Sequence, residues 1–179
     1  MQKSGSTAAG RSPPTGTSQD AIALLKADHR AVEKLFVQFE KTRFSSRKNK
    51  LAEEICAALK VHTKIEEEIF YPAFLAATSD KDMHHEAEVE HAGAKKLIAE
   101  IENSNSSDEY FDAKVKVLSE LIKHHVKEEE QPDGMFAEAR KSEMDLESVG
   151  EKLKARKDQL AGNGQTGKNR SSAGKSMNG

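Results

Sequence analysis

The sequence predicts an all-α protein, an antiparallel up-down four-helix bundle with an extra C-terminal helix. Apolar residues recur at helical spacing in four consecutive stretches of the chain. Polar segments rich in Gly, Pro, Asn and Ser, residues that end helices, separate these stretches. Aromatic residues make up 5% of the chain and charged residues 32%, a composition that suits amphipathic helices better than a β-sandwich or barrel.

The four bundle helices are expected over residues 20–44, 47–77, 81–103 and 107–131, and the extra helix within residues 135–160. Their inward stripes are Ile22, Leu25, Val32, Phe36 and Phe39; Leu51, Ile55, Leu59, Ile65 and Ile69; Ala87, Ala94, Leu97, Ile98 and Ile101; and Val115, Leu118, Leu121 and Ile122. Asp20 is a suitable N-cap for the first helix. Because proline cannot donate to the helical ladder, Pro72 should end or bend the second helix, and Pro132 should break the fourth.

We expect one domain over residues 20–161, flanked by disordered tails at 1–19 and 162–179, because the tails contain few large apolar side chains. The net charge of −2 gives no general attraction to nucleic acid or to an anionic membrane. No apolar run is long enough to span a bilayer or to act as a secretory signal. The single cysteine, Cys56, excludes an intramolecular disulfide framework, and a cytoplasmic location is expected.

Four of the seven histidines fall in the middle of the predicted core stripes, one on each helix. They are His29, His62, His91 and His125. Glu66 and Glu129 follow two of them at i+4, on the same helix face. Burying a lone carboxylate costs several kcal/mol unless it is paired or binds a metal. Alternatively, each histidine and glutamate is a hydrogen-bonded core residue without a metal. Such an explanation suits one buried polar residue better than six.

Imidazole and carboxylate ligands without thiolate suit iron, manganese or zinc. More than four candidate ligands exceed the need of one tetrahedral zinc ion, so two ions bridged by Glu66 and Glu129 form the simplest arrangement. His29 and His62 lie about equally far along the chain from the loop that joins their helices, so they should lie at the same level of the bundle. His125 lies at the level of His91 only if the fourth helix tilts or starts later. Of the other histidines, His124 is expected at the edge of the stripe and His85 on the surface, while His84 shares the face of His91 but lies two turns away, too far to bind the same ion. The acidic run 128–130 is expected on a mostly solvated face.

With these residues identified, the chain resembles the hemerythrin-like proteins of the HHE cation-binding family. The matching stretches are Leu25-Lys-Ala-Asp-His29, His62-Thr-Lys-Ile-Glu66-Glu-Glu-Ile-Phe-Tyr-Pro72, Val89-Glu-His91-Ala-Gly-Ala-Lys-Lys-Leu and His124-His125-Val-Lys-Glu-Glu129-Glu. The resemblance implies a four-helix bundle with a non-haem di-iron centre. In that family such centres serve dioxygen binding, oxygen or redox sensing, or iron handling under stress.

Carried over by position, the resemblance assigns His29 and His62 to one iron, and His91 and His125 to the other. It makes Glu66 and Glu129 the bridging carboxylates. Oxygen-carrying members have a second histidine four residues from the one on the third helix, but here Ala87 and Lys95 occupy those positions. Water or a nearby carboxylate such as Glu88 would replace the missing ligand, and an open position favours reactivity over reversible dioxygen storage. The break expected at Pro132 makes the bridging role of Glu129 the least secure of these assignments.

Three functions remain open from the sequence. The first is a di-iron protein of dioxygen binding or sensing, or of iron and oxidative-stress handling, which is a metal- and oxygen-binding protein rather than a dedicated enzyme. The second is a di-iron oxidase or peroxide-consuming enzyme that uses the open position next to His91. The third is a metal-free helical module that binds a protein partner through residues 135–160.

Overall fold

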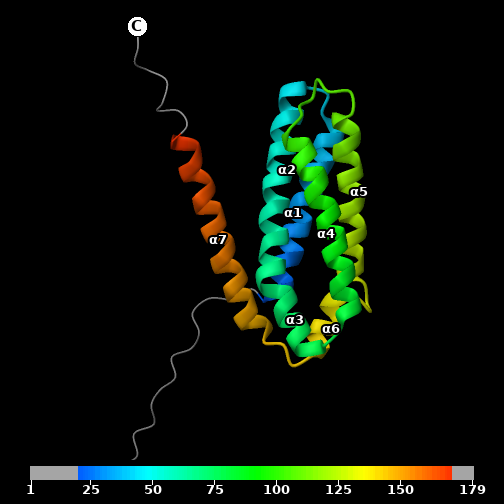
Figure 1. Cartoon of the computed structure of the whole chain (residues 1–179), viewed down its shortest axis with the longest axis vertical. Coiled ribbons are helices and arrows are strands. Elements are labelled where there is room, and N and C mark those ends of the chain that lie inside the picture. The colour runs from blue at the N-terminus through cyan, green and yellow to red at the C-terminus, as the bar shows by residue number, and fades with distance from the viewer. Residues whose placement is uncertain (1–19, 171–179) are drawn as a thin grey trace, which may run out of the picture.

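The structure, a computed structural model, describes residues 20–170, with side chains described up to residue 162. Its elements are α1 (Ala21–Lys41), α2 (Ser45–Ile65), the π-helical turn η1 (Glu66–Phe70), α3 (Tyr71–Thr78), α4 (Lys81–Glu102), α5 (Phe111–Glu130), α6 (Met135–Lys141) and α7 (Leu146–Arg170). Helices α1, α2, α4 and α5 lie side by side as an antiparallel bundle (Figure 1). The described residues contain no strand, which confirms the predicted all-α class.

The helix ends follow the local signals in the sequence closely. Asp20 caps α1 as predicted, since its Oδ1 accepts a hydrogen bond of 2.7 Å from the Ala23 N–H. Helix α5 ends at Glu130, two residues before Pro132, as the missing proline N–H requires. The same helix starts at Phe111 rather than near residue 107, which supplies the later start that the depth of His125 required.

The C-terminal segment differs from the single helix expected over residues 135–160. It forms α6, then a short connection, then α7. Helix α7 packs against α1, α2 and η1, and its C-terminal part diverges from the bundle (Figure 1). It continues to Arg170, so the domain limit expected at residue 161 falls inside a helix. The helix can extend this far because each added residue forms a hydrogen bond without the cost of starting a new helix. The remaining tail positions, 1–19 and 171–179, lie outside the described residues.

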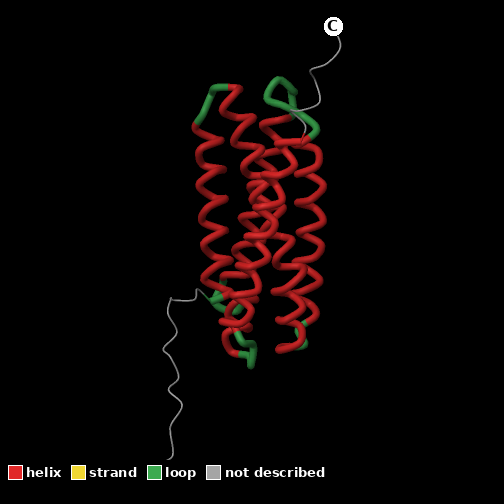
Figure 2. Tube along the Cα trace, turned by 90° about the vertical axis from the view of Figure 1, so that its left-hand side faces the viewer, coloured by secondary structure: helices red, strands yellow, loops and turns green. Residues whose placement is uncertain are grey.

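The connections of the bundle lie at its two ends, as Figure 2 shows, and the core divides along its length into two apolar clusters. One cluster fills the half that carries the α1–α2 and α4–α5 connections. The other fills the half that α3, α6 and the start of α7 cover. The buried side chains between the two clusters are polar. No helix of the described residues combines the length and apolarity needed to cross a membrane.

Gly134 holds the connection after α5 tightly against the end of that helix. A Cβ atom added to Gly134 would lie 2.1 Å from the Glu128 carbonyl oxygen and 2.9 Å from that of Glu129. Gly93, in the middle of α4, has room, because its added Cβ would lie 3.5 Å from the Leu121 side chain. The chain therefore contains two glycines on which the same substitution should have opposite effects.

We expect Gly134→Ala to lower the free energy of unfolding by about 1–3 kcal/mol, because backbone atoms must move to relieve the clash. Gly93→Ala should leave it unchanged or raise it by about 1 kcal/mol, since alanine favours a helix interior. Chemical denaturation of both variants followed by circular dichroism checks the difference. Equal effects of the two substitutions would contradict this account of the α5 terminus.

Candidate metal centre

The four histidines expected in the core are all buried, at exposed fractions of 1% for His29, 6% for His62, 1% for His91 and 3% for His125. On three helices the histidine lies between residues of the two apolar clusters. The histidine of α1, for example, has Leu25 of one cluster before it and Val32 of the other after it. The four side chains therefore meet at one level of the bundle, and this level is the polar layer between the clusters.

The histidines form two pairs across the bundle. The Nε2 atoms of His29 and His62 are 3.0 Å apart, and those of His91 and His125 are 3.2 Å apart. Each pair joins two neighbouring helices, α1 with α2 and α4 with α5. All four rings turn Nε2 toward the middle of the layer, so two nitrogen pairs face the space between the helices.

Two fully buried carboxylates lie between the histidine pairs. Glu66 places Oε1 3.3 Å from His62 Nε2 and Oε2 3.4 Å from His91 Nε2. Glu129 places Oε2 3.4 Å from His29 Nε2 and 3.6 Å from His125 Nε2. Each carboxylate thus contacts one histidine of each pair. Two positions result, each with two imidazoles and access to both carboxylates.

The turn that carries Glu66 is a π-helix, and this geometry brings Tyr71 into the layer. The Tyr71 N–H donates to the Glu66 carbonyl, an i to i+5 bond. In an α-helix two residues five apart face directions about 140° apart, and the wider turn reduces that angle. The expected bend at Pro72 is taken up by this turn, since Pro72 follows as the second residue of α3.

Tyr71 is a site residue whose hydroxyl the sequence alone could not place. Its hydroxyl lies 3.2 Å from His91 Nε2 and donates a hydrogen bond of 3.3 Å to Glu129 Oε1. It therefore stands where the sequence left an open position next to His91. Glu88, the carboxylate suggested for that position, is instead exposed and pairs with His84 at 3.7 Å, because its place on α4 points away from the layer.

An outer ring of carboxylates faces the four histidines and holds three of them by hydrogen bonds. The Nδ1 atoms of His29, His91 and His125 lie 2.8, 2.9 and 2.8 Å from Glu130, Glu67 and Glu90, and His62 Nδ1 lies 3.7 Å from Asp28. A carboxylate at Nδ1 fixes the tautomer that leaves Nε2 free to bind a metal. Sequence reasoning missed this ring, and only adjacency to a ligand, as in Asp28-His29, could have indicated it.

The run 128–130 is therefore not the mostly solvated face that was expected. Glu129 is 2% exposed, and Glu130 faces His29 and Arg30, at 2.8 and 2.6 Å. The run lies within the last turn of α5. Glu129 therefore points into the bundle, while the next residue, Glu130, reaches α1.

Burial and mutual repulsion oppose two negative charges in the middle of the layer. Burial and the neighbouring charge of Glu66 raise the pKa of Glu129 to about 8. Burial also acts to raise the pKa of Glu66, but the charges of His62 and His91 outweigh it and lower that pKa to about 2. A cation between the carboxylates would remove this conflict, because both could then be charged.

The buried carboxylate oxygens of the layer also favour a bound metal. Both oxygens of Glu66 and Oε2 of Glu129 are buried and accept no hydrogen bond within the described residues. Buried carboxylate oxygens are rarely left in that state. Two groups of side chains also have ligand atoms within 4.8 Å of one another, namely His29, His62 and Glu66, and Glu66, His91 and His125.

Comparison with known proteins agrees with this geometry. The profile of the Hemerythrin HHE cation binding domain matches residues 20–137. The chain belongs to this family. A hemerythrin HHE cation binding domain-containing protein from Mycobacterium kansasii has the same fold, with a TM-score of 0.68 and 24% identity over 80% of this chain and 88% of that one. No curated protein matches the chain. As an HHE domain, the chain binds metal cations, and α7 lies beyond the matched residues.

Because the outer carboxylates hold His29, His91 and His125, we expect the cation affinity of this HHE domain to depend on them. We expect Glu130→Gln to weaken Co²⁺ binding about 10–100-fold, because the hydrogen bond that orients His29 loses its charge. Glu33→Gln is the matched control, since Glu33 also binds Arg30 but has no contact with His29. Calorimetric titration measures both. Equal affinities of the two variants would show that the ring does not support the centre.

Proposed function

We propose that the protein binds two iron ions in this centre and uses them to bind or sense dioxygen, or to handle iron and oxidative stress, in the cytoplasm. One observation carries the proposal, namely that Glu66 and Glu129 each contact one histidine of both pairs. His29 and His62 would hold one ion, His91 and His125 the other, and the two carboxylates would bridge them. Imidazole and carboxylate ligands without thiolate suit iron.

Iron in such a site supplies reversible one-electron chemistry toward dioxygen. The chain's own residues supply two further properties. The apolar clusters above and below the layer keep water from entering along the length of the bundle, and Phe136 of α6 stacks on the His29 ring at a centroid distance of 5.8 Å. Tyr71 keeps its proton, because burial and the charges of Glu66 and Glu129 raise its pKa well above the usual value. Its hydroxyl can therefore donate a hydrogen bond to a small molecule near His91.

The full-length protein, loaded with iron and reduced, should change its visible absorption when air is admitted, and its metal content should be two irons per chain. A chain with His62→Ala and Glu66→Ala should lose most of this iron, since one position loses two contacts. Elemental analysis and absorption spectroscopy measure the two quantities. Two bound irons with a spectrum that air does not change would contradict the dioxygen function, while leaving metal binding intact.

A second candidate, a peroxide-consuming enzyme, is favoured by the position of Tyr71 and by an opening of the centre. A pocket lined by Ala87, His125 and Glu129 reaches the layer from the surface. If the protein turns over peroxide, Tyr71→Phe should retain iron and lower the rate about 100-fold, because the proton donor is lost. Oxygen release from hydrogen peroxide measures turnover. A single turnover per iron centre, in the unmodified protein, would eliminate this candidate.

Thermal stability distinguishes the iron centre from a metal-free interaction module, because only the iron centre should lose stability when metal is removed. If the centre holds iron, chelation should lower the melting temperature of the unmodified protein by several degrees, since ligands that bind only the folded state stabilise it. The variant with His62→Ala and Glu66→Ala should melt at the same temperature with and without chelator. Thermal melts followed by circular dichroism check both. An unmodified protein whose melting chelation does not alter would favour the interaction module.

A further inference from the structure

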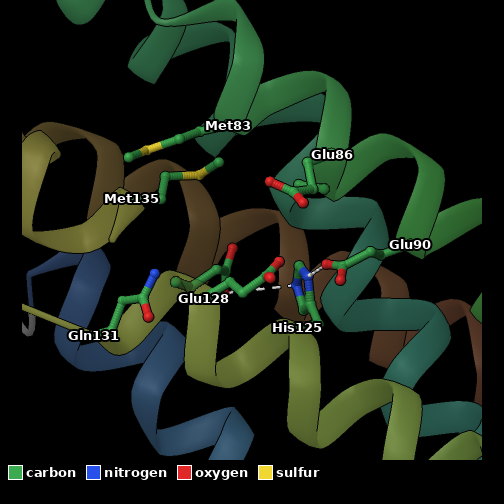
Figure 3. A pocket seen from close by; sticks show the side chains of 9 residues that line it. Met83, Glu86, Glu90, His125, Glu128, Gln131 and Met135 are labelled. Carbon is green, nitrogen blue, oxygen red and sulfur yellow. Dashed lines mark hydrogen bonds and ion pairs between the residues drawn. The ribbon is translucent and has the colours of Figure 1, made fainter. Parts of the chain in front are cut away.

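A pocket of about 120 Å³ connects the protein surface to the centre (Figure 3). Its inner wall includes His125 and Glu129, which are buried, and Glu86 and Glu128 line it nearer the solvent. The volume exceeds the roughly 30 Å³ that one water molecule occupies in the liquid, so a partly hydrated ion fits. Figure 3 shows the carboxylates of Glu86, Glu90 and Glu128 gathered around this space.

A third group of metal-ligand side chains lies beside the pocket. Ligand atoms of Glu90, His124 and Glu128 lie within 4.8 Å of one another. His124 Nε2 is 3.4 Å from Glu90 Oε1 and 3.0 Å from Glu128 Oε1. The His124 side chain is 59% exposed and that of Glu90 11%, so the group reaches from solvent toward the interior. One imidazole and two carboxylates at this separation suit a divalent cation such as Fe²⁺.

Glu90 links this outer group to the centre. Its Oε1 faces His124, whereas its Oε2 accepts a hydrogen bond of 2.8 Å from His125 Nδ1. Glu129 also lines the pocket, and its Oε2 is buried without a hydrogen bond from any described residue. A cation held at the outer group would therefore have an unpartnered carboxylate oxygen ahead of it, within the same pocket.

The charges around the outer ring distinguish this side of the centre from the other three. Glu130 pairs with Arg30, Glu67 with Lys95, and Asp28 with Lys157 of α7. In the described part of the chain, Glu90 pairs with His124 and His125 and with no lysine or arginine. The described side chains that line the pocket include His125 but no lysine or arginine. The pocket is therefore the side of the centre on which negative charge is left without a permanent cation.

We infer that Glu90, His124 and Glu128 form a cation-uptake site, at which Fe²⁺ binds on its way through the pocket to the centre. The inference rests on the proposed iron centre. A cleft lined by one sign of charge raises the local concentration of the opposite ion and its rate of capture by about 10-fold or more. Glu129 and His125, which line the inner wall of the pocket, would be the next ligands available to such an ion.

The test compares rates of iron loading. Metal-depleted full-length chain is mixed with Fe²⁺ without oxygen, and free iron is trapped with a chromogenic chelator at successive times. A double variant, His124→Ala with Glu128→Gln, should load about 10-fold more slowly than the unmodified chain and reach the same final iron content. Glu128→Lys should load more slowly still. Raising the salt concentration should slow the unmodified chain more than the double variant.

The matched control is His85→Ala with Glu88→Gln, which removes the same two groups from exposed positions on α4 outside the pocket. It should load at the unmodified rate. Equal rates for the two double variants, whether fast or slow, would overturn the uptake site. If the rates are equal but each chain still binds two irons, the iron centre stands and only the uptake site is overturned. If the unmodified chain takes up no iron, the iron centre and the uptake site are both overturned.

A measurement on the loaded protein does not depend on the depleted form. Titration of Co²⁺ into the iron-loaded chain, followed by calorimetry, should detect one weak additional ion per chain. The double variant with His124→Ala should lose that ion, and the control variant should keep it. No additional ion in the unmodified chain, or the same ion in the double variant, would contradict the inference.

Discussion

Two carboxylates buried between four imidazoles impose the constraint on which the rest of this structure depends. Glu66 and Glu129 are 0% and 2% exposed, in a layer that interrupts the apolar core. Burial and the charge of Glu66 raise the pKa of Glu129, so the two carboxylates oppose each other's ionisation. The helices above and below the layer are packed by ordinary apolar clusters, so the cost is confined to one level of the bundle.

The backbone near the layer departs from regular helix at both carboxylates. On one side the π-helical turn η1 carries Glu66 and brings Tyr71 beside it. On the other, α5 ends one residue after Glu129, and Gly134 folds the chain back against that terminus. Both departures lie next to a proline, Pro72 or Pro132. The missing proline N–H removes a helical hydrogen bond at each place, and the regular helix gives way to the π-helical turn in one case and ends in the other.

The outer ring links the centre to the surface charge of the bundle. Three of its carboxylates are held by lysine or arginine, and one of these cations, Lys157, comes from α7. Helix α7 lies beyond the residues that the HHE family profile matches. Its contacts with Asp28 and, through Arg156, with Glu68 add support to the α1 and η1 side of the layer from outside the matched residues.

The sequence by itself determined the helices and the inward face on which the six candidate ligands lie, because apolar periodicity and i+4 spacing are local properties. It also indicated that Pro132 would end α5. Only the tertiary structure decided which carboxylate faces which histidine, that Tyr71 rather than Glu88 stands beside His91, and that the extra helix divides into α6 and α7. Those outcomes depend on contacts between residues far apart in the chain and on one π-helical turn, and neither leaves a periodic signal in the sequence.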